Sequence, residues 1–275
     1  MDFDLSEPQT MLQNAARQFA LRAVLPRADE IDRNAEIPPD LLEEMKRLGF
    51  YALPFSSELG GGGAGFVGLT LVAEQICQAS MAVGFALSLA TCVGEEIAHF
   101  GTEQQKDKYL TSLIKGDAIP FWAFTEPTTG SDPTAIETTA HPDNDGYIIN
   151  GQKLFIALVP AAEWGVVFAK DDTDLVSAFV VQKSSPGFVT GDLHDVMGAR
   201  GLGASTIYFD SLHVPIENLL GKRGEGYQIL LDGASLERLA LATSCVGVGQ
   251  QALDLAAAPV ALRTCGCPWN MAAIE

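Results

Sequence analysis

The spacing of apolar residues changes twice along this 275-residue chain. Up to about residue 118 they recur every three or four positions, which is the spacing of one face of a helix. Next come short runs rich in Ile, Val and Phe, separated by Pro, Gly, Asp and Asn as in β-strands. From about residue 225 the helical spacing returns. The chain is therefore predicted to be α+β, with an N-terminal all-α domain (1–118), a central antiparallel β domain (119–224) and a C-terminal helical domain (225–275).

Two kinds of segment carry this prediction. Amphipathic helices are indicated by two sets of apolar positions, Met11, Ala15 and Phe19, then Leu41, Leu42, Met45 and Leu48. An antiparallel sheet or barrel is indicated by four apolar runs, Tyr147–Asn150, Gly165–Ala169, Val176–Val181 and Ser205–Phe209. After residue 225 a single long helix is predicted. Pro259 should end it, because proline has no backbone N–H to donate.

The charge of the chain limits its partners. It has 17 basic and 35 acidic residues, which gives a formal net charge of -18. Such a charge repels phosphate backbones, so nucleic acid is excluded from the expected partners. No apolar run reaches the roughly 18 residues that a membrane helix needs, and Asp2 and Asp4 without a basic region argue against a signal peptide. We therefore expect no membrane segment and a cytoplasmic location.

Cysteine and histidine give no sign of a metal centre. The five cysteines lack regular spacing, so reduced thiols are expected, with Cys77 and Cys92 in the core. The segment Cys265–Cys267 lacks the second pair of ligands that a zinc site needs. Solvated or structural roles are expected for the four scattered histidines, His99, His141, His194 and His213. No metal is predicted.

The segment Ala123–Asp132, AFTEPTTGSD, is the first candidate for a binding site. It places Thr125, Thr129 and Ser131 around Gly130, in a turn rich in hydroxyls and backbone N–H groups. Such a turn can hold an anionic or heterocyclic cofactor. On its own the pattern is more typical of a solvated surface loop, so its interpretation depends on the rest of the chain.

Seven motifs, in order, resemble those of the acyl-CoA dehydrogenase family, from the first residues to about Asp254. They are MDFDLSEPQ, LGG near Gly60, FGTEQQKDKYL, AFTEPTTGSD, YIINGQKLFI, GARGLGASTIYFDSLHVPIENLLGKRGEGY and SLERLALA. The resemblance implies the same three-part fold, in which a helical bundle follows the first C-terminal helix. Residues Pro259–Glu275 do not match that bundle. This indicates a truncated C-terminal helical domain, through truncation, an altered reading frame or a divergent terminus.

The resemblance implies an oxidoreductase, a flavoprotein of fatty acid metabolism that uses FAD to convert an acyl-CoA substrate to its enoyl-CoA. It also implies an electron-transfer flavoprotein as electron acceptor and a homo-oligomeric assembly. The implied cofactor contacts come from two segments, Phe124, Thr125, Gly130 and Ser131 in the first, and Phe155, Ile156 and Ala157 in the second. Ser131 would also touch the substrate, and Phe155 would shield the flavin by stacking.

Removing the α proton of a thioester needs a carboxylate opposite the flavin, in a dry pocket that raises its pKa. The segment SLER resembles the one that carries the catalytic Glu in the isovaleryl and long-chain branches, so Glu237 is the implied base. Arg238 and Ser235 would then contact the CoA moiety. The competing interpretation is that Glu237 and Arg238 are exposed charges on an amphipathic helix. Glu126, the other carboxylate considered, is expected to order its own loop.

Ala157 departs from the family pattern, which usually has Thr or Ser at this position. The hydroxyl that would hydrogen-bond the flavin N5 atom is absent, a loss of about 1 kcal/mol. Two alternatives therefore stay open. One is a flavin oxidase, monooxygenase or elimination enzyme on the same fold, and the other is a truncated non-catalytic homologue.

Overall fold

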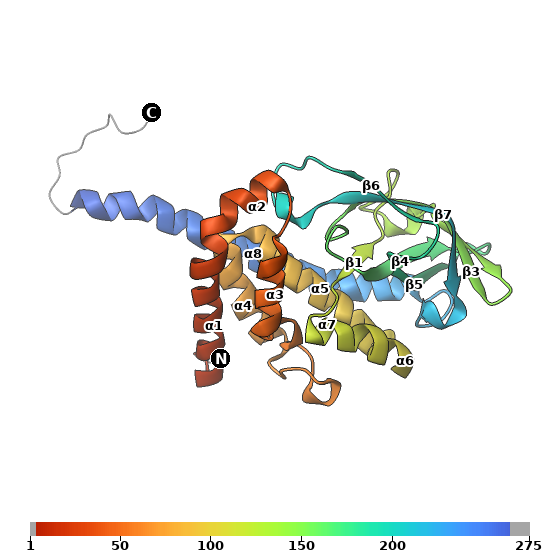
Figure 1. Cartoon of the computed structure of the whole chain (residues 1–275), viewed down its shortest axis with the longest axis horizontal. Coiled ribbons are helices and arrows are strands. Elements are labelled where there is room, and N and C mark those ends of the chain that lie inside the picture. Colours follow the sequence, from red (N-terminus) through yellow and green to blue (C-terminus); the bar gives the residue numbers. More distant parts are fainter. Residues whose placement is uncertain (1–3, 265–275) are drawn as a thin grey trace.

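The computed structural model describes residues 4–264 of the chain (Figure 1). The N-terminal helices form one half of the molecule and a sheet forms the other. The last helix, α8 (Gly226–Thr264), starts beside the sheet, crosses the helical half and continues beyond it (Figure 1). The predicted α+β fold class is confirmed, and of the predicted C-terminal helical domain the described chain contains this one helix. Cys265 and Cys267 lie outside the described residues.

Short helices surround two longer ones in the helical half. The α-helices before the sheet are α1 (Glu7–Phe19), α2 (Ala28–Asn34), α3 (Pro39–Arg47), α4 (Gly65–Ala79), α5 (Met81–Phe100), α6 (Glu103–Gln105) and α7 (Thr111–Lys115). π-helical turns at Ala20–Val24 and Lys106–Leu110 continue α1 and α6. α1 begins with a capping box, in which Ser6 and Gln9 each accept a hydrogen bond from the other's backbone N–H.

α5 is the central helix of the helical half. Over 18 of its 20 residues the mean hydropathy is 1.4, so the expectation that no segment is long and apolar enough to cross a membrane is wrong on length and composition. Inside the protein, 83% of that window is buried. α4, α8 and the first strand pack around it. A helix covered on several sides carries apolar residues all round, which explains its composition.

The described residues form a sheet of eight strands. They are β1 (Pro120–Ala123), β2 (Thr139–Asp143), β3 (Gly146–Ile156), β4 (Trp164–Lys170), β5 (Val176–Gln182), β6 (Phe188–Leu193), β7 (Ser205–Pro215) and β8 (Leu219–Leu220). Their order is β6-β7-β3-β2-β4-β5-β8, and β1 pairs with β4. Neighbours run antiparallel, except that β1 and β2 each run parallel to β4. All four predicted strands are confirmed, each within a strand of the structure.

Strands β4 and β5 are buried on both faces. Alternate residues of β4, such as Val166 and Phe168, join the helices in one apolar core. The residues between them, such as Val167 and Ala169, belong to a second core formed with the other strands. Side chains alternate between the two faces of a strand, so one strand can serve both cores. The sheet is therefore joined to the helices by packing as well as by the chain.

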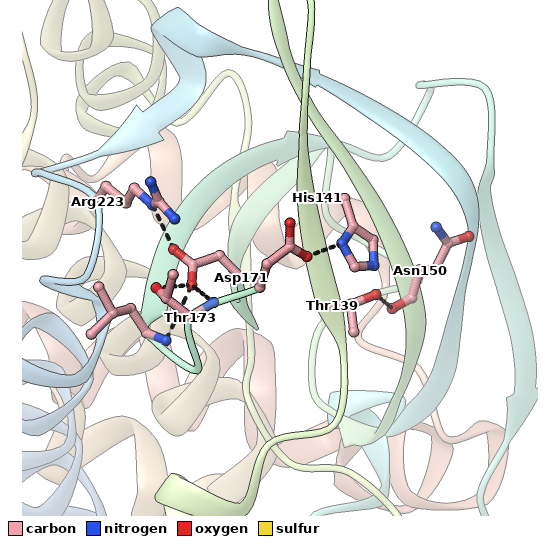
Figure 2. Close-up of polar contacts among 8 residues, drawn as sticks. Thr139, His141, Asn150, Asp171, Thr173 and Arg223 are labelled. Carbon is pink, nitrogen blue, oxygen red and sulfur yellow. Dashed lines mark hydrogen bonds and ion pairs between the residues drawn. The ribbon is translucent and has the colours of Figure 1, made fainter.

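The start of α8 is fastened to the turn between β4 and β5. In that turn Asp171 accepts hydrogen bonds from Thr173 and from the backbone N–H of Leu175, and it pairs with Arg223 at 2.5 Å (Figure 2). Burial opposes the ionisation of Asp171, but these hydrogen bonds outweigh it and lower its pKa to about 2. The ion pair thus fixes the chain just before α8 begins.

α8 is longer than predicted. It runs through Pro259 to Thr264, so the prediction that Pro259 ends it is wrong. A proline inside a helix removes one hydrogen bond, and the bonds of the adjoining turns keep the helical path at that cost. The helix packs against β5, α5 and α4. Farther along, Leu253 and Leu255 are 61% and 64% exposed.

Candidate functional site

The two predicted cofactor segments lie side by side. The backbone N–H of Leu154 donates to the carbonyl of Thr125 at 2.9 Å. One residue earlier, the Nζ of Lys153 donates to the carbonyl of Phe124 at 3.2 Å. The end of β3, which leads into Phe155, is therefore bonded directly to the segment that follows β1.

A buried ion pair lies beneath these two segments. The Nζ of Lys153 is 2.7 Å from Oε1 of Glu126, and the two side chains are 0% and 2% exposed. Glu126 also accepts hydrogen bonds from the backbone N–H groups of Glu137 and Thr138. Burial opposes the ionisation of Glu126, but Lys153 and these hydrogen bonds outweigh it and lower its pKa. Glu126 orders its own loop, as predicted, and Lys153 is its unpredicted partner.

The turn after Glu126 leaves hydrogen-bond donors at its tip. Glu126 and Thr129 exchange backbone hydrogen bonds, and the Thr129 hydroxyl donates to the carbonyl of Asp132. Between them, Gly130 and Ser131 are exposed. Within residues 4–264, their backbone N–H groups and the Ser131 hydroxyl make no hydrogen bond. These groups are available to an anionic or heterocyclic ligand.

Phe155 is an exposed aromatic ring on an unusual backbone conformation. Its φ of 57° is left-handed, and the ring is 55% exposed. A register shift between β3 and β7 lies between Lys153 and Ile156, a bulge that can turn Phe155 outward. The ring packs against His194 with centroids 4.6 Å apart. Ile156 is buried in the sheet core and Ala157 is half-buried against the helical core, so at Ile156 only the backbone remains for a cofactor.

Glu237, the predicted base, lies where α8 meets α5. It is half-buried, and burial raises its pKa while Arg238 opposes the shift. Burial, with a smaller contribution from Glu237, also raises the pKa of Cys92 and Glu96 on α5, which places Glu237 at that interface. Glu237 is therefore not a fully exposed surface charge. Both Cys92 and Cys77 are buried free thiols, as expected.

Ser235 and Arg238 lie on the outer side of α8. Both are exposed, and the Ser235 hydroxyl donates to the carbonyl of Leu231 in its own helix at 2.8 Å. The Arg238 guanidinium is near enough to Glu237 to influence the pKa of that carboxyl. Both side chains are accessible to a ligand, and their contact with CoA stays a prediction.

Trp122 of β1 connects the cofactor segments with α8. Its ring lies 4.8 Å from that of Phe124. On its other side, a Cβ added to Gly233 of α8 would lie 3.4 Å from its Cζ2 atom. Gly233 precedes Glu237 by about one helical turn, so both share one face of α8. Contacts through Trp122 therefore join the cofactor segments to the helix that carries the predicted base.

The structure also brings together a group that the sequence did not predict. Asp143, Asp145 and His213 place their possible ligand atoms within 4.8 Å of one another, and all three are at least partly exposed. Asp145 pairs with His213 at 2.9 Å. His141, which Figure 2 shows, pairs with Asp172. Exposed acidic groups of this kind are common without an ion, and nothing else at this place points to a ligand.

Comparison with known proteins identifies the class to which this fold belongs. The models for the N-terminal and middle domains of acyl-CoA dehydrogenases match residues 6–117 and 122–212. An acyl-CoA dehydrogenase of Bacillus subtilis is 35% identical over 255 residues, which cover 91% of this chain and 67% of that protein. The chain belongs to the acyl-CoA dehydrogenase family, as its motifs predicted. It spans about two thirds of the length of this relative.

Solved structures agree on the fold. Butyryl-CoA dehydrogenase from Megasphaera elsdenii has a TM-score of 0.89 at 30% identity, over 92% of this chain and 69% of that one. A structure described as the electron transferring flavoprotein of Acidaminococcus fermentans has a TM-score of 0.89 at 35% identity, over 92% and 68%. An acyl-CoA dehydrogenase complexed with FAD from Bacillus anthracis has a TM-score of 0.84 at 30% identity, over 89% and 42%.

The candidate site fits FAD at two places and departs from the family pattern at one. The exposed donors of Gly130 and Ser131 suit a phosphate or the polar edge of a flavin. The exposed ring of Phe155 suits the face of a planar heterocycle. Ala157 supplies no side-chain hydroxyl, so one hydrogen bond that the family pattern would provide is absent.

Proposed function

We propose that this chain binds FAD and dehydrogenates an acyl-CoA thioester to the enoyl-CoA. The substrate loses a proton from its α carbon to a base and a hydride from its β carbon to the flavin. The observation that supports this most is the junction at Trp122, with the bonded cofactor segments on one side and the helix of Glu237 on the other. FAD supplies the electron-accepting ring. The residues of this chain bind and orient the substrate and accept its proton.

Glu237 is the proposed base. Because burial raises its pKa, the carboxylate holds a proton from the substrate more firmly than an exposed carboxylate would. Arg238 opposes that shift, which favours the ionised form before substrate arrives. The balance between the two effects suits a group that must first be charged and then accept a proton.

The remaining predicted residues are proposed to bind CoA, FAD or the substrate. Ser235 and Arg238 hold the CoA moiety, because a guanidinium forms forked hydrogen bonds with phosphate. Phe124 and Thr125 meet the flavin pyrimidine ring, and Gly130 and Ser131 meet the FAD phosphates. Ser131 also meets the substrate. Phe155 covers the flavin face, with the backbone of Ile156 and Ala157 beside it.

The partners and the location are proposed on the family and the chain's composition. An electron-transfer flavoprotein is the proposed acceptor, supported by the likeness to the Acidaminococcus fermentans structure. A homo-oligomer in the cytoplasm completes the proposal. Light scattering of the purified chain and fractionation of its source cells test these two points, and a monomer or a membrane-bound pool would contradict them.

The experiment that tests the function is FAD binding followed by reduction. After addition of FAD and desalting, the visible spectrum should retain a bound-flavin band, and butyryl-CoA added without oxygen should bleach it. Glu237→Gln should keep the band and lose the bleaching, whereas Asp254→Asn, a carboxyl change on the same helix, should bleach normally. A colourless protein would instead support the non-catalytic homologue, and unchanged bleaching in Glu237→Gln would require another base.

Ala157 supports one alternative, in which the reduced flavin reacts with oxygen. Oxygen uptake during turnover separates the two outcomes, because a dehydrogenase passes its electrons to another protein. Uptake equal to the product formed would replace dehydrogenation with an oxidase or monooxygenase reaction. If oxygen uptake is negligible in the wild type and in Ala157→Thr, the dehydrogenase proposal stands.

A further inference from the structure

A cleft of about 310 Å³ opens between α4, α5 and α8, which is within the size range of small-molecule sites, about 300–1,000 Å³. Its walls carry three carboxyl groups, Glu95, Glu96 and Asp232, and two aromatic rings, Phe66 and Phe100. Charged groups thus lie beside apolar surface. Ser235, which is proposed to hold the CoA moiety, also lines this cleft, whereas the proposed base and the cofactor segments do not.

Glu96 is the unusual member of the cleft, because it is buried without a partner. It is 3% exposed, and its Oε2 atom makes no hydrogen bond within residues 4–264. The buried indole N–H of Trp122 is likewise without a hydrogen bond there. Burial chiefly raises the pKa of Glu96, the indole N–H of Trp122 opposes the shift because it lies near the carboxyl although outside hydrogen-bond geometry, and the carboxyls of Glu237 and Asp232 add to the shift. A buried polar group without a hydrogen bond is costly and calls for an explanation.

The sequence of α8 makes room for this carboxyl. A Cβ added to Gly233 would lie 1.9 Å from Oε1 of Glu96, so only glycine fits while Glu96 keeps its place. Glycine inside a helix is about 1 kcal/mol less favourable than alanine. α8 therefore gives up stability at a position that faces the Glu96 carboxyl.

The spacing of the carboxyls excludes a metal ion. A bound divalent cation draws several oxygens to within about 2.0–2.6 Å of one point. Among the described residues, the cleft holds no group of three possible ligands whose atoms lie within 4.8 Å of one another. An anion is excluded by the charge of the same carboxyls. A larger cation on an alkyl chain matches both the separated carboxyls and the aromatic rings.

We propose that this cleft binds an organic ammonium ion, with Glu96 as its buried counter-ion. The ammonium group donates to Oε2 of Glu96, and its alkyl chain packs on Phe66 and Phe100. Asp232 and Glu95 attract the cation from the rim. The site shares Ser235 with the proposed CoA site, but it uses neither FAD nor the proposed base.

Ammonium binding by Glu96 is coupled to a proton. Burial raises the pKa of Glu96, whereas a bound cation favours its carboxylate and lowers that pKa, so binding releases protons over the range in which the carboxyl titrates. Affinity therefore rises with pH. The other titratable groups that face the cleft or Glu96 are Glu95, His99, Asp232 and Glu237.

Titration of the isotope-labelled full chain with n-butylammonium chloride tests the proposal. The backbone amide signal of Gly233 should shift and saturate, with an affinity that increases as pH rises. n-Butanol, the neutral probe of similar shape, should leave the signal unchanged. Glu96→Gln should weaken binding at least about tenfold, because a neutral amide cannot pair with the cation.

Two further variants keep the test decisive. Asp232→Asn changes a rim carboxyl and should weaken binding about two- to fivefold, so it serves even where Glu96→Gln does not fold. Glu58→Gln removes a carboxyl outside the cleft and should bind as the wild type does. Equal binding of n-butanol, unchanged affinity in Glu96→Gln, or the absence of saturation would each overturn the proposal. Neither FAD nor turnover enters the measurement, so its failure is distinguishable from failure of the proposed function.

Discussion

Two buried glutamates, one in the sheet half and one in the helical half, have opposite electrostatic surroundings. Glu126 pairs with Lys153 at 2.7 Å and its pKa is lowered, whereas Glu96 has an unpartnered oxygen and its pKa is raised. They are 4% and 3% exposed, so their exposure does not explain the opposite pKa shifts. The presence or absence of a charged partner does. A buried charge that has a partner stabilises the fold where two segments meet. A buried carboxyl without a partner marks a place where a ligand can supply the missing hydrogen bond or charge.

The largest effect should come from removing the partner of Glu126. Lys153→Met leaves a buried carboxylate without its cation and should lower the free energy of unfolding by about 3–5 kcal/mol. Urea unfolding measures this change. Lys170→Met is the matched control, because Lys170 pairs at 3.8 Å with Asp174, whose side chain is 92% exposed, and such pairs contribute at most about 1 kcal/mol. Equal effects of the two changes would contradict the difference between a buried and an exposed ion pair.

The next effect concerns the glycine that faces Glu96. Gly233→Ala should destabilise the chain by about 1–3 kcal/mol, because its Cβ would lie 1.9 Å from Oε1 of Glu96. Gly249→Ala in the same helix should stabilise it by about 0.5–1 kcal/mol, because nothing lies within 4 Å of a Cβ there. Thermal unfolding of the two variants compares the signs. Stabilisation by both would show that α8 does not hold Glu96 in place.

The smallest expected effect is the change in the free energy of unfolding with each pH unit. Because the folded state raises the pKa of Glu96, its contribution is present below the unfolded value, near 4.3, and declines as pH rises toward the folded value, by at most about 1.4 kcal/mol per pH unit. Glu126 has the opposite sign, since a lowered pKa gives stability above the unfolded value that is lost as pH falls.

Glu96→Gln isolates the first of these contributions. Its stability relative to the wild type should increase from about pH 4 to about pH 8, measured by urea unfolding at each pH. Glu58→Gln, an exposed change, should keep a nearly constant difference from the wild type. A difference between Glu96→Gln and the wild type that stays constant over this range would show that Glu96 does not hold its proton in the folded chain.

The fold was largely predictable because its signals are local. Short apolar runs such as Val176–Val181 become strands of the sheet, and helical spacing gives the long helices. Other strands were missed for physical reasons, since β1 has only four residues and β6 is largely exposed, without a clear apolar face. The rule that Pro259 stops a helix also failed, because it describes one residue while helix formation is cooperative along the chain.

Residues of the site could be predicted only where they lie in a recognisable sequence motif. The turn at Thr125 and the helix of Glu237 follow from motifs, although their ligand contacts remain predictions. Lys153 was missed because its partner, Glu126, lies 27 residues away, although its even spacing from the buried Ile149 hinted at an inward position. Glu96 was not predicted from the sequence, because its surroundings depend on Trp122 and Gly233, which only the folded chain brings near.

Lys153 has a further consequence for the chemistry around it. Thioesters acylate amines, and the reactive form is the unprotonated amine, so a lysine whose pKa is lowered by burial has a larger unprotonated, reactive fraction than an exposed lysine. The burial that lowers this pKa also leaves the side chain 0% exposed, with its nitrogen bonded to Glu126 and to the carbonyl of Phe124. A member of a family that handles activated acyl groups thus keeps this amine where no acyl donor can reach it.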